Sequence, residues 1–389
     1  MTDNLTAAGL ENVRAAAVRH VSPDQVPGLV ALVASSDQVH VEALGTLSVG
    51  GPAVQRDSLF RIASVTKPVT GAVILALIEE GLIGLDEPVD TLLPELAHPR
   101  VLRRMSGPLA DTVPAERPVT TRDLLTFTFG FGMVIEMFMA KERWPVHSAV
   151  AELSLAAFGP SDPAHQPEPD TWMARLGSLP LMAQPGERWM YNTGACVLGV
   201  LAARAAGQSF GEVLRTRIFD PLGMQSTAFW TSDLQRLATA YQRAPGGLVV
   251  ADPPGGAWSK PPAFEDGAAG LLSTVDDLHA FARMLLRGGA PVLAPESVAA
   301  MTVDQLTPEQ KAHGGLGSGF FDHQSWSYCQ AVQDNGAFGW NGGSGTSWLI
   351  DPVRDLVVIV LTQRQFETSE PPEVHREIQA AAYAALADH

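Results

Sequence analysis

The stretch RIASVTKPVT, residues 61–70, places a serine three residues before a lysine and a proline directly after that lysine. Proline lacks an N–H group and is tolerated in a helix only in the first turn, so Pro68 predicts a helix that begins near Ser64. The apolar run VTGAVILALI that follows would bury this helix. Because Ser64 and Lys67 are three residues apart, their side chains would share one face of the first turn.

A buried lysine at this position can act as a base. Burial disfavours the charged form of the amine, and so does the positive end of the helix dipole. An uncharged Lys67 could then accept the proton of the Ser64 hydroxyl, while free backbone N–H groups at the helix start could donate to a developing oxyanion. The Ser-x-x-Lys pattern alone is weak, since it often arises by chance. The alternative is that Ser64 only caps the helix and Lys67 is exposed.

Composition indicates a globular protein that acts on small molecules. The 389 residues are 46% hydrophobic and 17% charged, and no long polar linker divides them, so one large domain or two closely packed domains are expected. The net charge of -16 would repel nucleic acids and anionic membranes, and neither is predicted as a partner. The oligomeric state is left unassigned.

No pattern in the sequence supports a metal, a cofactor or a disulfide framework. The two cysteines, Cys196 and Cys329, lie far apart, and the ten histidines form no spaced ligand set. The N-terminal residues lack the basic region and apolar run of a secretory signal, and no apolar stretch approaches the roughly 20 residues that a membrane span needs. A cytoplasmic protein without a cofactor is therefore expected.

Both ends of the chain predict strands beside a helix. Near the N-terminus, apolar residues at helical spacing precede GLVALVA and VHVEALG, and near the C-terminus GTSWLI and DLVVIVLT precede a helix from about Pro372. The middle of the chain reads as several helices. We therefore expect an α+β fold, with an antiparallel sheet built from both chain ends, flanking helices and an inserted, mainly helical domain. The sheet domain would comprise residues 1–63 and 236–389 and the helical domain residues 64–235, with the active site at their interface.

Two segments of the middle region are candidates for the walls of a site. Residues 158–170, FGPSDPAHQPEPD, form a proline-rich loop that could be a lid, a pocket wall or an ordinary surface loop. Residues 127–140, FTFGFGMVIEMFMA, are rich in Phe and Met and would suit apolar substrate groups, or else belong to the core of the helical domain.

Several ordered segments carry a family resemblance. They are PGERWMYNTGACVLG, FDPLGMQST, GAAGLLSTVDDLHAFARMLL and FGWNGGSGTSW. Together with Ser64-Val-Thr-Lys67 they resemble the serine β-lactamase and penicillin-binding-protein superfamily, on the class C side that includes family VIII carboxylesterases. The resemblance spans most of the chain, and it implies a fold of the β-lactamase and transpeptidase type.

The resemblance also implies roles for individual residues. Ser64 would be the nucleophile and Lys67 its activating base, while Tyr191 would relay a proton to the leaving group. In the third motif, Gly342 and Gly343 lie at the end of a strand, and Gly343 would supply an oxyanion N–H beside that of Ser64. The alternatives are a core tyrosine and plain turn glycines.

The chain departs from the family pattern at two motifs. Where relatives have Tyr-x-Asn, this sequence has Tyr191-Asn192-Thr193, so the substrate-binding amide is either replaced by Thr193 or shifted to Asn192. Where β-lactamases have Lys-Thr-Gly, it has Trp340-Asn341-Gly342, and the cation that would hold a substrate carboxylate is missing. Trp340 could face a substrate or pack in the core. The tryptophan is similar to that of family VIII esterases and favours neutral esters.

The resulting prediction is a serine hydrolase that forms an acyl-enzyme, with small neutral esters, or amides, as substrates. The alternatives are a β-lactamase, a D-amino-acid peptidase or amidase, an acyltransferase, and a binding protein without activity.

A second serine, Ser209, lies in a Gly-x-Ser-x-Gly pattern typical of an α/β-hydrolase nucleophile elbow. An alanine-rich helical segment precedes it, so Gly207 is expected to end that helix and Ser209 to form a capping box with Glu212.

Overall fold

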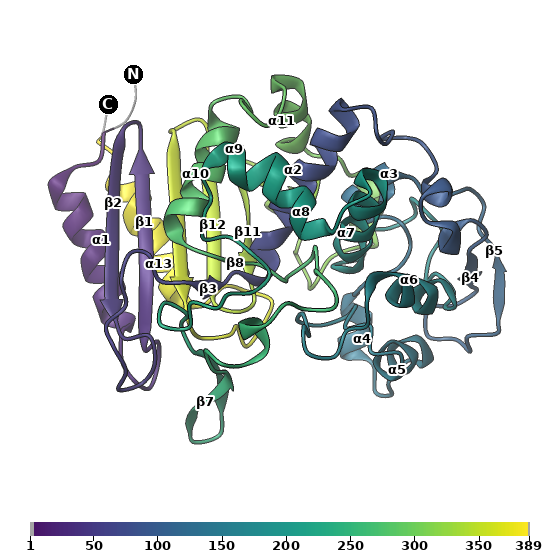
Figure 1. Cartoon of the computed structure of the whole chain (residues 1–389), viewed down its shortest axis with the longest axis horizontal. Coiled ribbons are helices and arrows are strands. Elements are labelled where there is room, and N and C mark those ends of the chain that lie inside the picture. Colours follow the sequence, from purple (N-terminus) through teal and green to yellow (C-terminus); the bar gives the residue numbers. More distant parts are fainter. Residues whose placement is uncertain (1–3, 388–389) are drawn as a thin grey trace.

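A seven-stranded antiparallel sheet brings the two ends of the chain together (Figure 1). A computed structural model describes residues 4–387 of the protein. The strands of this sheet are β1 (Gly28–Ser35), β2 (Gln38–Gly45), β9 (Gln324–Trp326), β10 (Ala331–Gln333), β11 (Phe338–Gly342), β12 (Thr346–Asp351) and β13 (Leu356–Thr362). Their order is β2-β1-β13-β12-β11-β10-β9, and Leu29 of β1 lies opposite Thr362 of β13. The predicted sheet built from both chain ends is confirmed.

Helices cover both faces of the central strands. On one face α1 (Ala7–His20) and α13 (Glu373–Ala384) pack together, and on the other lies α10 (Val275–Leu286). Alternate residues of β1 belong to these two cores, Leu29 with α1 and α13 and Val30 with α10. Every residue of β1 and β13 is buried, which explains why their sequences are continuous apolar runs.

The remaining α-helices lie between β1 and β13 in the sequence. They are α2 (Thr66–Glu79), α3 (Thr121–Leu125), α4 (Ile135–Met139), α5 (Pro145–Glu152), α6 (Pro169–Gly177), α7 (Thr193–Ala206), α8 (Phe210–Leu214), α9 (Asp220–Leu222), α11 (Pro295–Met301) and α12 (Pro308–Ala312). Figure 1 shows α3 to α7 gathered to one side of the sheet, as expected of an inserted helical region. The boundaries at 63/64 and 235/236 remain a prediction.

Residues 210–222 are helical without a break, but the helix is not regular. Helix α8 ends at Leu214, and a π-helical turn spans Arg215–Phe219 before α9. Pro221 follows in the next turn and lacks the N–H that a continuous α-helix would require there. The wider turn accommodates the missing donor.

Three short strand pairs complete the fold. They are β3 (Phe60–Arg61) with β8 (Leu272–Ser273), β4 (Arg100–Leu102) with β5 (Thr112–Pro114), and β6 (Ala240–Ala244) with β7 (Gly247–Asp252). The first pair places the residues that precede Ser64 beside the end of the glycine-rich segment, residues 267–273. The β6 and β7 hairpin projects from the molecule in Figure 1.

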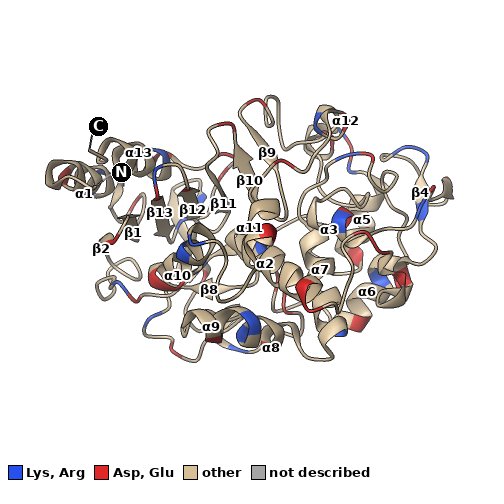
Figure 2. Ribbon diagram, turned by 90° about the horizontal axis from the view of Figure 1, so that it is seen from above, with Lys and Arg blue, Asp and Glu red and all other residues tan. Residues whose placement is uncertain are grey.

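Charged residues of both signs are interspersed along the ribbon (Figure 2). None of the helices in the described part of the chain combines the length and the apolar composition that a transmembrane span requires. Across residues 4–387, no group of three or more His, Cys, Asp and Glu side chains is placed to bind a metal ion.

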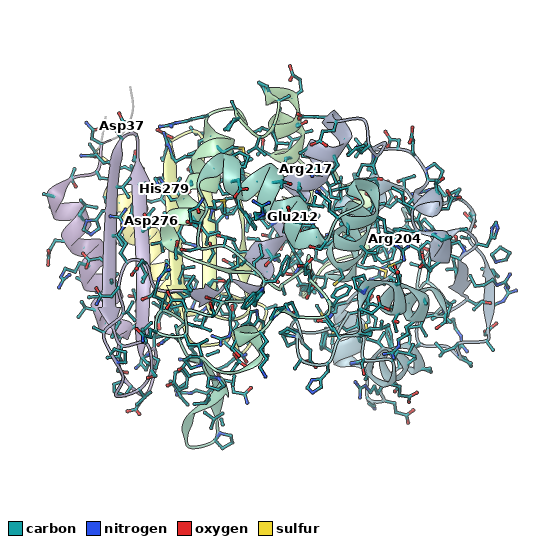
Figure 3. All side chains as sticks on the ribbon, in the orientation of Figure 1. Asp37, Arg204, Glu212, Arg217, Asp276 and His279 are labelled. Carbon is teal, nitrogen blue, oxygen red and sulfur yellow. The ribbon has the colours of Figure 1, made fainter. Side chains whose placement is uncertain are left out.

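Arg204, which is labelled in Figure 3, links three parts of the helical region. From α7 its guanidinium pairs with Glu95 at 2.8 Å and with Asp170 in α6 at 2.8 Å, and it also donates to the carbonyl of Leu92. The hydrogen bonds to Glu95 are the main reason that the pKa of Arg204 is raised above its ordinary value. These contacts hold α7, which follows Tyr191, in place.

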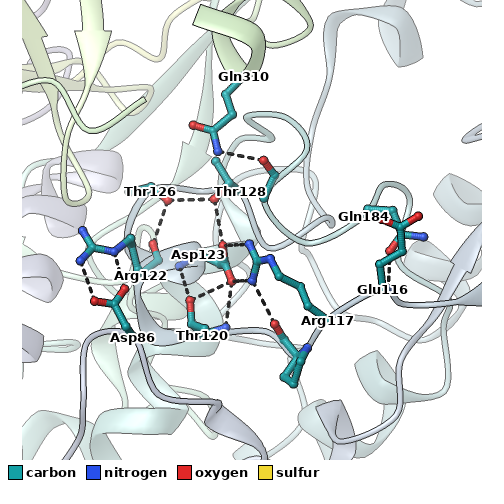
Figure 4. Close-up of polar contacts among 12 residues, drawn as sticks. Asp86, Glu116, Arg117, Thr120, Arg122, Asp123, Thr126, Thr128, Gln184 and Gln310 are labelled. Carbon is teal, nitrogen blue, oxygen red and sulfur yellow. Dashed lines mark hydrogen bonds and ion pairs between the residues drawn. The ribbon is translucent and has the colours of Figure 1, made fainter. Parts of the chain in front are cut away.

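The start of α3 is fixed by a capping network (Figure 4). Thr120 Oγ1 accepts from the N–H of Asp123, and the Asp123 carboxylate accepts from the N–H of Thr120. Arg117 donates to both oxygens of this carboxylate, at 2.6 and 2.7 Å, and Thr128 Oγ1 donates to one of them. The network therefore anchors the chain just before residues 127–133, and Met133 at the end of this segment pairs with the backbone of Tyr191.

His375 joins α13 to the sheet in a fully buried position. Its Nδ1 lies 3.0 Å from Ser347 Oγ on β12, and no part of the side chain is exposed. Burial, together with the neighbouring His20, lowers the pKa of His375 to about 3. The folded protein thus keeps this imidazole neutral.

We expect His375 to make the free energy of unfolding fall as the pH decreases from about 6.5 toward 3. In this range the histidine of the unfolded chain, with a pKa near 6.5, binds a proton that the folded state excludes. The contribution is about 1.4 kcal/mol per pH unit. His375→Gln retains an acceptor for Ser347 but does not titrate, so urea unfolding of this variant at several pH values should give a shallower slope. Equal slopes for the two proteins would contradict the prediction.

Candidate active site

Ser64 lies in a 3-10 turn, Ala63–Val65, that continues directly into α2. Pro68 is the third residue of α2, so the predicted helix start near Ser64 is confirmed. Ala63 has a φ of 43°, in the left-handed region that non-glycine residues rarely adopt. The backbone is therefore strained immediately before the predicted nucleophile, as is common at functional sites.

Lys67 points back to Ser64 from a fully buried position. Its Nζ lies 2.9 Å from Ser64 Oγ and donates to the carbonyl of Ala268 at 2.9 Å, and its side chain has no exposed surface. The alternative of an exposed lysine is thus wrong, because α2 is buried on every side of its first turn. At hydrogen-bonding distance, a proton can pass between the hydroxyl and the amine.

Tyr191 lies beside Lys67 and makes a second contact with the third motif. Lys67 Nζ is 4.6 Å from the centre of the Tyr191 ring, and the Tyr191 hydroxyl accepts a hydrogen bond of 2.6 Å from Trp340 Nε1. The backbone of Tyr191 pairs with Met133 through two hydrogen bonds. The structure therefore brings Ser64, Lys67 and Tyr191 together, as predicted from motifs far apart in the sequence.

Asn192 forms a tight turn between Tyr191 and α7. Its φ of 84° and ψ of -62° match a γ-turn of the rare, strained type, and the N–H of Thr193 donates to the carbonyl of Tyr191. Asn192 lines the cavity beside Ser64, whereas Thr193 is fully buried and its hydroxyl donates to the carbonyl of Ala157 at 3.1 Å. Of the two candidates for a substrate-binding amide position, only Asn192 reaches the cavity.

Trp340 lies on β11 and is half-buried, with its indole N–H directed at Tyr191. It is not among the described residues that line the cavity at Ser64. Trp340, which stands where β-lactamases have a lysine, therefore places a neutral donor against Tyr191. The sequence pattern did not reveal this contact, since the two residues lie in separate motifs.

The end of β11 is clamped to the residues before Ser64. Thr346 Oγ1 donates to the carbonyl of Ile62 at 2.9 Å, and Ser344 Oγ donates to the carbonyl of Arg61. Gly342 permits this approach, because a Cβ there would lie 2.2 Å from the Ile62 oxygen. Gly343, the predicted oxyanion donor, lines the same cavity as Ser64.

The cavity beside Ser64 encloses about 490 Å³. Its walls are largely apolar, from the side chains of Met133, Phe138, Phe158, Trp258 and Phe366. Segment 127–140 contributes to both the core and the cavity, since Phe127, Phe129 and Phe131 are buried in the core, whereas Met133 and Phe138 line the cavity. Loop 158–170 contributes its first four residues to the wall, which accords with the pocket-wall alternative.

Arg61 and Asp252 form a buried ion pair in this wall, which the sequence did not predict. Arg61 also donates to the carbonyls of Ala238 and Pro253, and its guanidinium carbon lies 5.3 Å from the centre of the Trp258 ring. Burial lowers the pKa of Arg61, and the Asp252 carboxylate acts in the opposite direction. Of the described residues that line the cavity, Arg61 alone has a cationic side chain, and its charge is already paired.

The Gly-x-Ser-x-Gly pattern is not a nucleophile elbow. Gly207, with a φ of 64°, ends α7, and Ser209 Oγ accepts from the N–H of Glu212 at the start of α8. The expected capping box is only half formed, because the Glu212 carboxylate pairs with Arg215 instead of returning to the Ser209 N–H (Glu212 is labelled in Figure 3). Ser209 thus joins two helices, as predicted.

A sequence model of the family described as Beta-lactamase matches residues 13–383. The chain belongs to the β-lactamase family. Protein Rv1367c of Mycobacterium tuberculosis (strain H37Rv) is 37% identical over 336 residues, which cover 80% of this chain and 79% of that protein. Esterase EstB of Burkholderia gladioli is 29% identical over 378 residues, with 89% and 88% covered.

The fold is also similar to that of solved structures. The structure of EstCE1, described as a hydrolase with promiscuous acyltransferase activity, superposes with a TM-score of 0.78 at 24% identity and covers 97% of this chain and 99% of that one. The predicted resemblance is confirmed, and the protein is a serine hydrolase.

Two adjacent glycines provide a matched test of the clamp at β11. Gly342→Ala should lower the free energy of unfolding by about 1–3 kcal/mol, because the new methyl group would collide with the Ile62 carbonyl and with Thr346 Oγ1, each 2.2 Å from the Cβ position. Gly343→Ala should leave stability unchanged, since nothing lies within 4 Å of its Cβ position. Denaturant unfolding of both variants measures this. Equal stabilities would show that the approach of β11 to Ile62 is not tight.

Proposed function

We propose that this protein is a carboxylesterase that cleaves small neutral esters through an acyl-enzyme on Ser64. The observation that carries the proposal is the cavity at Ser64, whose walls are largely apolar and in which Arg61, the one cation among the described lining residues, is paired with Asp252. A pocket of this kind favours apolar, uncharged groups. The name of the relative Esterase EstB, which matches along most of the chain, supports the same activity.

In the proposed acylation step, Ser64 Oγ attacks the ester carbonyl while its proton passes to Lys67 Nζ. The backbone N–H groups of Ser64 and Gly343 would donate to the oxyanion of the tetrahedral intermediate. The C–O bond to the alcohol then breaks, and the departing oxygen receives a proton from the Tyr191 hydroxyl, which Lys67 restores. Water subsequently attacks the acyl-enzyme, giving the carboxylic acid and free Ser64.

Trp340 has a supporting role in this proposal. Its indole N–H donates to the Tyr191 hydroxyl at 2.6 Å and so holds the phenol in one orientation. The indole donates without a positive charge, so this position offers no counterpart for a substrate carboxylate.

Esters are preferred over β-lactams and peptides in this proposal for the same reason. Substrates of those two classes carry a carboxylate that a lysine of the third motif would bind, and position 340 is a tryptophan.

We also propose that the protein is cytoplasmic, as expected from the sequence. Fractionation of the native cells tests this location.

Ser64→Ala should lower kcat/KM for 4-nitrophenyl acetate by on the order of 10³-fold or more, because no nucleophile would remain. Ser209→Ala is the matched control and should keep wild-type activity, since Ser209 only caps α8. A fluorophosphonate probe should label wild-type protein at Ser64, as mass spectrometry of the peptides would show. Full activity in Ser64→Ala, or labelling at Ser209, would refute the proposed function.

The preference for uncharged substrates can be measured with two esters of equal acyl length. We expect kcat/KM for 4-nitrophenyl butyrate to exceed that for 4-nitrophenyl hemisuccinate by about 30-fold or more, equivalent to about 2 kcal/mol. The terminal carboxylate of the succinyl group would lose its hydration in an apolar cavity without a free cation. Similar values for the two esters would indicate that Arg61 leaves Asp252 to bind the substrate.

A further inference from the structure

The connection between α5 and α6 is held by four buried side-chain donors directed at two backbone carbonyls. The carbonyl of Leu155 accepts from Trp172 Nε1 at 2.9 Å and from Gln166 Nε2 at 3.2 Å. The carbonyl of Ala157 accepts from Asn192 Nδ2 at 3.2 Å and from Thr193 Oγ1 at 3.1 Å. Leu155 and Ala157 have no exposed surface. This part of the connection is therefore a fixed element and not a free lid.

The residue after Ala157 is the first of the cavity wall. Phe158 lines the cavity at Ser64, and its ring stacks on Phe131 with centroids 5.2 Å apart and an interplanar angle of 24°. The His147 ring packs edge-on against Phe158 at 5.9 Å. The rings of Phe131 and His147 thus fix the Phe158 side chain, and hydrogen bonds to the carbonyl of Ala157 fix the backbone just before it.

The motif that follows Tyr191 supplies two of the four donors. Thr193 does not reach the cavity, and Asn192 uses its amide nitrogen on the same carbonyl. The departure from Tyr-x-Asn to Tyr191-Asn192-Thr193 therefore couples the tyrosine turn to the cavity wall. The residues involved are far apart in the sequence, since Ala157 and Thr193 are separated by 36 residues.

We propose that Thr193, together with Asn192, is a positioning residue that fixes Phe158 and thereby limits the size of the acyl group the enzyme accepts. The inference rests on the proposed esterase function. The acyl group stays bonded to Ser64 while the alcohol departs, so a fixed wall beside Ser64 acts chiefly on the acyl group. If the Ala157 carbonyl is released, the wall can retreat and the cavity can admit larger groups.

Thr193→Val tests the proposal, because valine has the shape of threonine without the hydroxyl donor. The ratio of kcat/KM for 4-nitrophenyl octanoate to that for the acetate should rise about 5-fold or more, since the wall no longer excludes the longer chain. Thr193→Ser keeps the donor and should keep the wild-type ratio within about 2-fold. Phe158→Ala, which removes the wall directly, should raise the ratio at least as far as Thr193→Val. An unchanged or lower ratio in folded Thr193→Val would overturn the proposal.

Hydrogen exchange provides a test that does not depend on activity. Backbone amides of residues 155–161 should exchange faster in Thr193→Val than in wild-type protein, with Thr193→Ser unchanged. Equal exchange in all three proteins would overturn the proposed anchoring. The two proposals fail in different ways: the esterase function fails if Ser64→Ala remains active, whereas this inference fails if the acyl-length ratio or the exchange of residues 155–161 does not respond to Thr193→Val.

Discussion

The buried contact between Lys67 Nζ and Ser64 Oγ is the constraint on which the rest of the site depends. An amine without exposed surface must find hydrogen-bond partners inside the protein, and the carbonyl of Ala268 supplies one. The segment that carries Ala268 is itself tied to α2, because Thr70 Oγ1 donates to the carbonyl of Gly267 at 2.7 Å. Helix α2, its buried amine and the segment around Ala268 therefore form one unit, and displacement of that segment would deprive the amine of one of its two hydrogen-bond partners.

Local patterns in the sequence predicted the parts of the molecule that are determined locally. Pro68 marks the start of α2 because its effect is confined to one helical turn, and the terminal strands follow from continuous apolar runs that only a doubly covered sheet requires. The contacts that complete the cavity could not be predicted in this way. Trp340 and Tyr191 are 149 residues apart, and no local pattern indicates that an indole in one motif donates to a phenol in another. The same is true of the wall, since the proline-rich loop could be recognised but its anchors could not.

The backbone is strained next to both Ser64 and Tyr191, and hydrogen bonds from neighbouring segments hold the strained turns. Ala63 precedes Ser64 with a φ of 43°, and Asn192 follows Tyr191 with a φ of 84°. Conformations of this kind cost about 1–3 kcal/mol each and persist only where neighbouring contacts hold them. Such contacts are present at both positions: Thr346 Oγ1 binds the carbonyl of Ile62, and the Asn192 side chain binds Ala157. The hydrogen bonds that shape the cavity wall thus also oppose relaxation of the turns that carry Ser64 and Tyr191.

The tryptophan at position 340 and the ion pair in the cavity wall have a common consequence for selectivity. With a neutral donor at Tyr191 and with Arg61 paired to Asp252, the described residues of the cavity wall present no unpaired charge to a ligand. A charged substrate entering this space would lose its hydration without gaining a partner, whereas an apolar group would gain from the displacement of water.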